Sequence, residues 1–214
     1  MRLLIIGPPG GGKGTQSKFL IDHLQIPQIS TGDILRENIK NKTSLGIEAK
    51  QFMDLGKLVS DSLIMNMIKK RLNKDDCNNG YILDGFPRTI PQAQGLDKLL
   101  KGMNQKIDHV IVMNVPDNLI IERLSNRRTC KSCGALYNLL FEPPSNIKKC
   151  DRCGGDLYQR SDDNSKTINQ RLSIYHDQTK PVINHYENQK ITKSIDSSGT
   201  IDEINKSIIK SISN

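Results

Sequence analysis

The 214-residue chain contains no tryptophan, and only 4% of its residues are aromatic. Proteins that bind single-stranded nucleic acid stack the bases on aromatic side chains, so this shortage argues against nucleic acid as the main partner, despite a formal net charge of +8. Long apolar runs are lacking too. No segment approaches the roughly 20 apolar residues of a membrane span, and the run at residues 3–6 is too short for a signal peptide. We expect a cytoplasmic protein without a membrane partner.

Apolar segments alternate with helical patterns along the chain. Strands are expected at residues 3–6, 81–83 and 109–115 and 191–195, with a weaker candidate at 26–29. Helices are expected at 13–24, 30–39, 44–55, 61–72, 91–102, 117–127 and 165–188, and from residue 200 onward. Strands separated by helices favour an α/β fold with a mainly parallel sheet, and ligands of such sheets bind at the carboxyl ends of the strands.

A glycine-rich segment follows the first apolar run directly. Residues 7–15 read GPPGGGKGT, which matches the Walker A pattern except that Gly14 stands where Ser or Thr is usual and the hydroxyl comes one residue later, at Thr15. Backbone N–H groups of such a loop, together with the N-terminus of the next helix, bind phosphate oxygens, and Lys13 adds a mobile cation. The phosphate ligands that this pattern predicts are Gly10, Gly11, Gly12, Lys13, Gly14 and Thr15.

Four of the five cysteines form two C-x-x-C pairs. Cys130 and Cys133 make the first pair, Cys150 and Cys153 make the second, and 16 residues separate them. This spacing predicts a tetrahedral metal site with four thiolate ligands; zinc is the preferred ion, and an iron centre or disulfides are the alternatives. Four protein ligands leave no open position for water, so the metal is expected to be structural. Cys77 is left over as an ordinary thiol.

Three further segments point to a family. Residues 81–89 read YILDGFPRT, residues 30–33 read STGD and residues 160–163 read RSDD. Together with the glycine-rich loop and the cysteine pairs, they strongly resemble adenylate kinases over essentially the whole chain. The resemblance implies a parallel five-stranded P-loop core (1–29, 60–125 and 164–214), a helical AMP-binding insert (30–59, the NMP insert) and a zinc-bearing LID insert (126–163). It also implies a monomer.

The activity that this resemblance implies is reversible transfer of the terminal phosphoryl group of MgATP to AMP, giving two ADP. The attacking AMP phosphate oxygen is already ionised near neutral pH, so no general base is required and the four histidines are expected to be packing or surface residues. Closure of the LID is expected to exclude water. The alternatives are a kinase for GMP, CMP or UMP, a regulatory nucleotide-binding switch and a zinc-ribbon nucleic-acid module. The FPR segment at residues 86–88 and the dispersed arginines disfavour the last two.

The resemblance also implies roles for individual residues. The expected catalytic residues are Lys13, Arg88, Arg123, Arg160 and Arg171, with Asp84 as the acid that organises Mg²⁺. ATP contacts beyond the glycine-rich loop are expected at Arg123, Arg127, Leu136, Tyr137 and Gly199. AMP contacts are expected at Thr31, Arg36, Lys57, Leu58, Val59, Gly85, Phe86, Pro87, Arg88, Gln92, Arg160 and Arg171.

Each of these roles has a plainer alternative. Asp84 stands where a short acidic residue often caps a helix, and any single arginine could form a surface ion pair. Small or apolar residues at the positions expected near the bases could be ordinary packing. Gln92 has a clearer chemical reason, because its amide offers a donor and an acceptor to the amino group and ring nitrogen of adenine. Asp162 and Asp163 are expected to pair with basic groups near the LID hinge.

Overall fold

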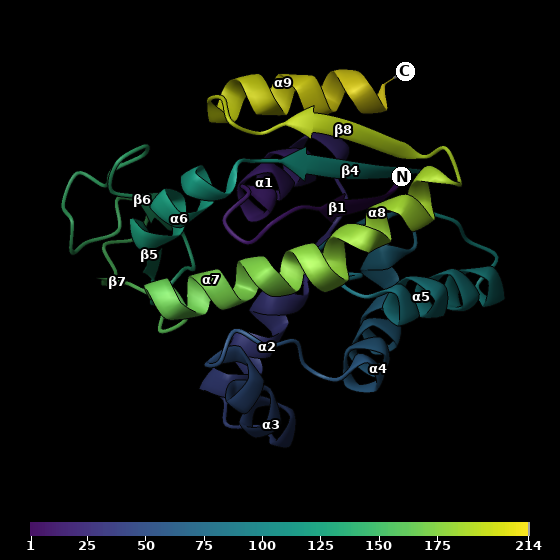
Figure 1. Ribbon diagram of the computed structural model, residues 1–214, viewed down its shortest axis with the longest axis horizontal. Helices are drawn as coiled ribbons and strands as arrows, with labels where there is room; N and C mark the ends of the chain where they lie inside the picture. The colour runs from purple at the N-terminus through teal and green to yellow at the C-terminus, as the bar shows by residue number, and fades with distance from the viewer. Residues whose placement is uncertain (214) are drawn as a thin grey trace.

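Five parallel strands form the central sheet of the structure, a computed structural model that describes residues 1–213 (Figure 1). The strand order is β2-β3-β1-β4-β8, and the bounds in that order are Gln28–Ser30, Tyr81–Asp84, Arg2–Ile6, His109–Asn114 and Thr192–Asp196. Every neighbouring pair is parallel, which confirms the predicted fold class. All carboxyl ends therefore meet at one edge, where the glycine-rich loop follows β1 and Asp84 ends β3.

Helices cover both faces of this sheet because the side chains of a strand alternate in direction. Leu3 and Ile5 of β1 pack in one apolar cluster with helices α1 (Lys13–Leu24) and α9 (Ile201–Ile212). Leu4 and Ile6 pack in the other cluster with α4 (Asp61–Leu72), α5 (Ile90–Gly102) and α8 (Lys180–Glu187). Among residues 1–213, no helix combines the length and apolar character that crossing a membrane would require.

The helix expected at residues 165–188 is interrupted. It consists of α7 (Ser165–Ile174), a π-helical turn at Tyr175–Thr179 and α8, which follow one another as one rod in Figure 1. Pro181, in the first turn of α8, has no N–H for the carbonyl four residues earlier, at Asp177. A π turn accommodates such a break in the hydrogen-bond ladder without ending the helix.

Residues 30–59 hold two short helices that project from the sheet at the bottom of Figure 1. Helix α2 (Thr31–Lys40) begins at the Ser30 cap, and α3 (Ser44–Met53) begins at the Thr43 cap. The two helices pack so closely that a Cβ at Gly46 would lie 2.1 Å from the carbonyl oxygen of Asn38. The expected helix end at residue 55 was two residues too late, and Gly56 follows with a positive φ of 68°.

Residues 126–163 fold around a small antiparallel sheet at the left of Figure 1. The strands are β5 (Arg127–Cys130), β6 (Leu136–Asn138) and β7 (Leu157–Tyr158), in the order β6-β5-β7. Helix α6 (Asp117–Ser125) ends where β5 is about to begin, so the predicted helix to residue 127 was too long. The domain boundaries expected from the sequence remain a prediction, and these elements are consistent with them.

Candidate active site

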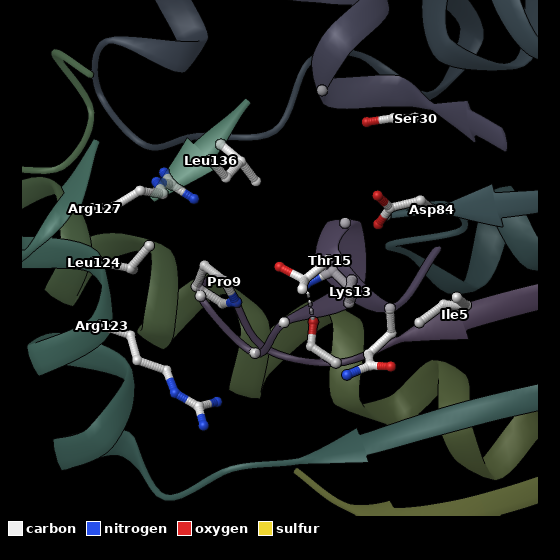
Figure 2. A pocket seen from close by; sticks show the side chains of 18 of the residues that line it. Ile5, Pro9, Lys13, Thr15, Ser30, Asp84, Arg123, Leu124, Arg127 and Leu136 are labelled. Atoms are coloured by element: carbon white, nitrogen blue, oxygen red, sulfur yellow. Dashed lines mark hydrogen bonds between the residues drawn. The ribbon is translucent and has the colours of Figure 1, made fainter. Parts of the chain in front are cut away.

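A cavity of about 890 Å³ opens at the carboxyl edge of the sheet (Figure 2). The glycine-rich loop and Asp84 line it from the core, and Leu136 and Arg127 from the LID insert lie across from them in Figure 2. A second cavity, of about 70 Å³, adjoins the NMP insert. Arg88 and Arg171 line both cavities. Arg36 lines both cavities as well, so the two spaces share three cations.

The glycine-rich loop ends at the first turn of α1. Gly12 is the N-cap of this helix in the left-handed region, with φ of 87°, and it brings no side chain to cover the N–H groups of the first turn. Lys13 Nζ folds back over the loop and donates to the carbonyl oxygens of Gly7 (2.9 Å) and Pro8 (2.7 Å). The first-turn amides and a cation thus face one side of the large cavity, as binding of an anion requires.

The pKa of Lys13 is lowered from 10.5 to about 7, mainly by burial and in smaller part by the nearby Arg88, Arg171 and Arg127, while Asp84 opposes the fall. The pKa falls because the ammonium is removed from water among other cations, which disfavours its charged form. Polyphosphate in the cavity would restore the charge on Lys13. The site is therefore electrostatically matched to an anionic ligand.

Asp84 lies at the end of β3 with 7% of its surface exposed. Burial raises the pKa of this carboxyl group, Lys13 opposes the rise, and Gln28 Nε2 donates to Oδ2 at 2.8 Å. A Cβ at Gly14 would lie 3.5 Å from the same oxygen, so the unusual glycine leaves the space beside the carboxylate free. Asp84 and Thr15 line the same cavity and offer hard oxygen ligands, which suit Mg²⁺.

Arginines from three parts of the chain gather over the cavities. Burial lowers the pKa of Arg160 to about 9 and of Arg171 to about 10, with Arg127 adding to both effects, and burial likewise lowers the pKa of Arg88. Arg88 Nε donates to the Gly85 carbonyl at 2.7 Å, and Arg160 Nε donates to Thr129 Oγ1 at 3.1 Å. These bonds orient the guanidinium groups and leave donors for phosphate oxygens.

Asp162 and Asp163 pair with basic groups as the sequence predicts. The Asp163 side chain is 0% exposed and accepts from Nε and Nη2 of Arg127 at 2.8 and 2.6 Å. Arg171 Nη1 lies 3.0 Å from Asp162 Oδ2 and 3.5 Å from Asp163 Oδ1. The two carboxylates therefore tie the start of the LID sheet and the helix that follows the insert to one point.

The small cavity is lined by most of the residues expected to contact AMP. They are Thr31, Arg36, Lys57, Leu58, Val59, Gly85, Arg88, Gln92 and Arg171. Arg36 pairs with Asp33 at 2.5 Å, and Thr31 Oγ1 donates to the Gly85 carbonyl at 3.0 Å. Pro87 and Arg160 line the large cavity, whereas Phe86 is buried in the core cluster with 1% exposure. Their contacts with AMP remain predictions.

The four cysteines of the LID insert lie together. Their sulfur atoms are all within 4.8 Å of one another, with Cys130 and Cys153 at 3.6 Å and Cys133 and Cys150 at 3.7 Å. A tetrahedral ion with metal–sulfur bonds of about 2.3 Å requires sulfur separations of about 3.8 Å. None of the four is in a disulfide. Backbone N–H groups of Cys133 and Ser132 lower the pKa of Cys130, so the first turn favours the thiolate of this cysteine.

Known proteins resemble this chain over nearly its whole length. A family model described as adenylate kinase matches residues 5–191. The chain belongs to the adenylate kinase family. Three curated relatives named adenylate kinase come from Syntrophobacter fumaroxidans (51% identical over 95% of this chain and 96% of the relative), Caldicellulosiruptor saccharolyticus (50%, over 99% of each) and Methanocella arvoryzae (52%, over 95% and 94%). The chain is accordingly a nucleoside monophosphate kinase, and adenylate kinases transfer phosphoryl groups reversibly between ATP and AMP.

In this adenylate kinase family member, Arg123 and Arg127 do not lie on the same secondary-structure element, contrary to what the sequence predicts. The helix expected at residues 117–127 would carry both Arg123 and Arg127, but that was wrong because α6 ends at Ser125 and Arg127 belongs to β5. Figure 2 shows the two side chains pointing in different directions. The Arg123 guanidinium lies 6.0 Å from the ring centroid of Phe141. Both arginines line the large cavity, and their ATP contacts remain predictions.

The other residues expected near ATP line the large cavity. Leu136 and Tyr137 come from the LID sheet, and Gly199 comes from the loop between β8 and α9. Sequence reasoning missed Phe141, which lines the same cavity with 55% of its surface exposed. It also missed Gln28 beside Asp84. An exposed phenylalanine in a cysteine-rich insert was a usable signal, whereas nothing in the sequence near Gln28 indicates a contact with residue 84.

Proposed function

We propose that this chain transfers the terminal phosphoryl group of MgATP to AMP, with ATP in the large cavity and the base of AMP at the small one. The observation that carries the proposal is that Arg88 and Arg171 line both cavities. A phosphoryl group passing between two anions needs cations that contact donor and acceptor together. Two cavities joined by shared arginines are suited to that need.

The chain's own residues supply positioning and charge neutralisation. Lys13 and the amides of the glycine-rich loop hold the ATP phosphates, and Arg36 and Arg88 hold the AMP phosphate. Arg160 and Arg171 stabilise the charge on the group in transfer. When bound with ATP, Mg²⁺ neutralises phosphate charge, and Asp84 with Thr15 would hold it. No residue need remove a proton, because the attacking phosphate oxygen is ionised.

The LID insert excludes water in this proposal. Water competes with AMP for the phosphoryl group, so transfer requires a covered site. Leu136 and Tyr137 of the insert and Lys13 of the core line one cavity, which supports a closing motion that brings Arg127 and Arg160 to the phosphates. We assign zinc to the four cysteines as a structural ion, with iron as the alternative.

An acceptor panel tests the proposed reaction. Purified protein with MgATP is offered AMP, GMP, CMP or UMP, and nucleoside diphosphate formation is measured. AMP should be the preferred acceptor and yield two ADP per turnover. Preference for another monophosphate would assign the chain to a different nucleotide, and ATP hydrolysis without an acceptor would favour a nucleotide switch.

Metal and mass measurements complete the test. Elemental analysis should find one zinc ion per chain, and a preparation with iron in its place would correct the metal assignment. We also propose a cytoplasmic monomer without a nucleic-acid or membrane partner. Light scattering during size-exclusion chromatography should give a mass near 24.0 kDa. A dimer mass would contradict the monomer.

A further inference from the structure

A carboxylate outside both cavities holds the glutamine that reaches into the smaller one. Asp61 is the first residue of α4 and is not among the residues that line either described cavity. Its Oδ1 accepts from Gln92 Nε2 at 2.7 Å and from Thr89 Oγ1 at 3.1 Å. Gln92 lines the small cavity and is 2% exposed. Asp61 therefore reaches the cavity through the side chain of Gln92.

The two ends of the Gln92 amide are held by partners of opposite kinds. Its Oε1 accepts from the backbone N–H of Arg88 at 2.8 Å, while its Nε2 donates to Asp61. A backbone N–H can only donate, and an ionised carboxylate can only accept. If the amide turned over, an NH₂ group would face the N–H and a carbonyl oxygen would face the carboxylate. Both hydrogen bonds would be lost, so the surroundings impose one orientation.

The oriented amide has a defined capacity left for a ligand. One N–H of Nε2 and one lone pair of Oε1 remain after the two bonds to the protein. Adenine offers an amino donor beside a ring-nitrogen acceptor, which this donor and acceptor complement. A 6-oxopurine offers a carbonyl acceptor beside a protonated ring nitrogen, so donor and acceptor are exchanged. Its edge would fit the turned-over amide, which Asp61 and the Arg88 N–H disfavour.

We propose that Asp61 is a positioning residue for base selection, which makes the acceptor site favour a 6-aminopurine over a 6-oxopurine nucleoside monophosphate by holding Gln92 in one orientation. This inference rests on the proposed function, because it takes the small cavity as the place of the AMP base. The same carboxylate accepts from Thr89, the N-cap of α5, whose Oγ1 accepts from the Gln92 backbone N–H at 3.2 Å. Asp61 thus restrains both the side chain and the helix turn that carries it.

The test compares AMP with IMP, whose bases differ at position 6, in wild type, Asp61→Ala and Asp61→Asn. Loss of a hydrogen bond to a charged group weakens binding by about tenfold or more. Asp61→Ala should therefore raise the KM for AMP about tenfold and lower the AMP-to-IMP ratio of kcat/KM by a similar factor. The KM for ATP should stay within about twofold, because Asp61 does not reach the ATP cavity. Asp61→Asn keeps an acceptor oxygen, but its amide can also turn and donate, so it should restore only the part of the ratio that the Arg88 N–H still imposes.

A double-mutant cycle separates positioning from general structural support. In a Gln92→Ala background, Asp61→Ala should change the KM for AMP by less than about twofold, because its intermediary is gone. Asp97→Ala is the matched control: Asp97 on α5 accepts from His185 of α8 at 2.8 Å, away from both cavities, and its loss should leave the AMP-to-IMP ratio unchanged. If Asp61→Ala misfolds, Asp61→Ser keeps a residue suited to a helix start but is too short to reach Gln92.

Three results would overturn the inference. They are an unchanged AMP-to-IMP ratio in folded Asp61→Ala, an equal rise in the KM for ATP and AMP, and a full Asp61→Ala effect in the Gln92→Ala background. If the wild-type protein phosphorylates AMP normally, any of these results leaves the proposed function unaffected. Wild-type protein that fails to phosphorylate AMP would instead refute the proposed function itself.

Discussion

The core and the LID insert both contribute residues to the site, but the two regions are stabilised in different ways. In the core, the strands around the glycine-rich loop bury Leu3, Leu4 and Ile5 completely, and two large apolar clusters cover both faces of the sheet. In the LID insert, the buried cluster consists of Cys130, Ala135 and Cys150. The core can be stable through apolar burial, whereas the LID insert buries little apolar surface, so we expect the proposed metal to stabilise it.

This contrast separates chemistry from stability. The core contributes Lys13 and Asp84 on a rigid edge, and the LID contributes Arg127 and Arg160 on a small lobe. Removing a core cation should therefore lower turnover strongly without unfolding the protein. Removing a LID cysteine should destabilise the lobe while the chemical groups remain.

The largest effect is expected for Lys13→Met. It removes a preorganised phosphate-stabilising cation, so kcat should fall by about 10²-fold or more. Steady-state kinetics measures the loss, and circular dichroism checks that the variant is folded. Lys101→Met, an exposed lysine on α5, is the control and should keep near-normal kcat. Near-normal turnover in folded Lys13→Met would refute the assigned phosphate site.

Cys150→Ser and Leu83→Ala should destabilise different parts of the protein. Leu83 is 0% exposed in the core, so its truncation should lower the free energy of global unfolding by about 2–5 kcal/mol. Cys150→Ser should lower the zinc content and the melting temperature yet retain appreciable activity at low temperature. Hydrogen exchange should show the loss of protection confined to residues 126–163 in Cys150→Ser and spread through the sheet in Leu83→Ala. Full thermal stability in a zinc-free variant would contradict the structural role of the metal.

The smallest expected effect is a change in proton binding at Lys13. Because the pKa of Lys13 is lowered from 10.5 to about 7, the ligand-free folded protein binds fewer protons at this group than the unfolded chain between those values. Its contribution to the free energy of unfolding therefore rises with pH from about 7 toward 10.5. ATP restores the charge, so binding at pH 8 should be accompanied by proton uptake.

Calorimetry in buffers of different ionisation enthalpy measures this uptake. Lys13→Met is the control, and the uptake should be smaller in that variant by up to one proton per ATP. Equal uptake in both proteins would show that the proton goes to another group. The contrast between the core and the LID insert would remain, but Lys13 would not be the group whose charge responds to ATP.

Features that depend only on residues close together in the chain were predicted well from the sequence. The alternation of strands and helices, the glycine-rich loop at the end of β1 and the cysteine pairs all lie within short segments. The errors fall where distant parts of the chain intervene. The helix predicted to residue 127 ends earlier because Arg127 pairs with β6 residues in the LID sheet. The three short LID strands carry too weak a pattern to be recognised.

The sequence by itself determined the phosphate loop, the parallel sheet and the four-cysteine cluster, because glycine conformations, apolar periodicity and ligand spacing act over a few residues. The tertiary structure alone decided which cavities share Arg88 and Arg171. It also decided that Asp61, on α4, holds the amide of Gln92 on α5. These contacts depend on how separate helices pack against one sheet, and no local pattern encodes that packing.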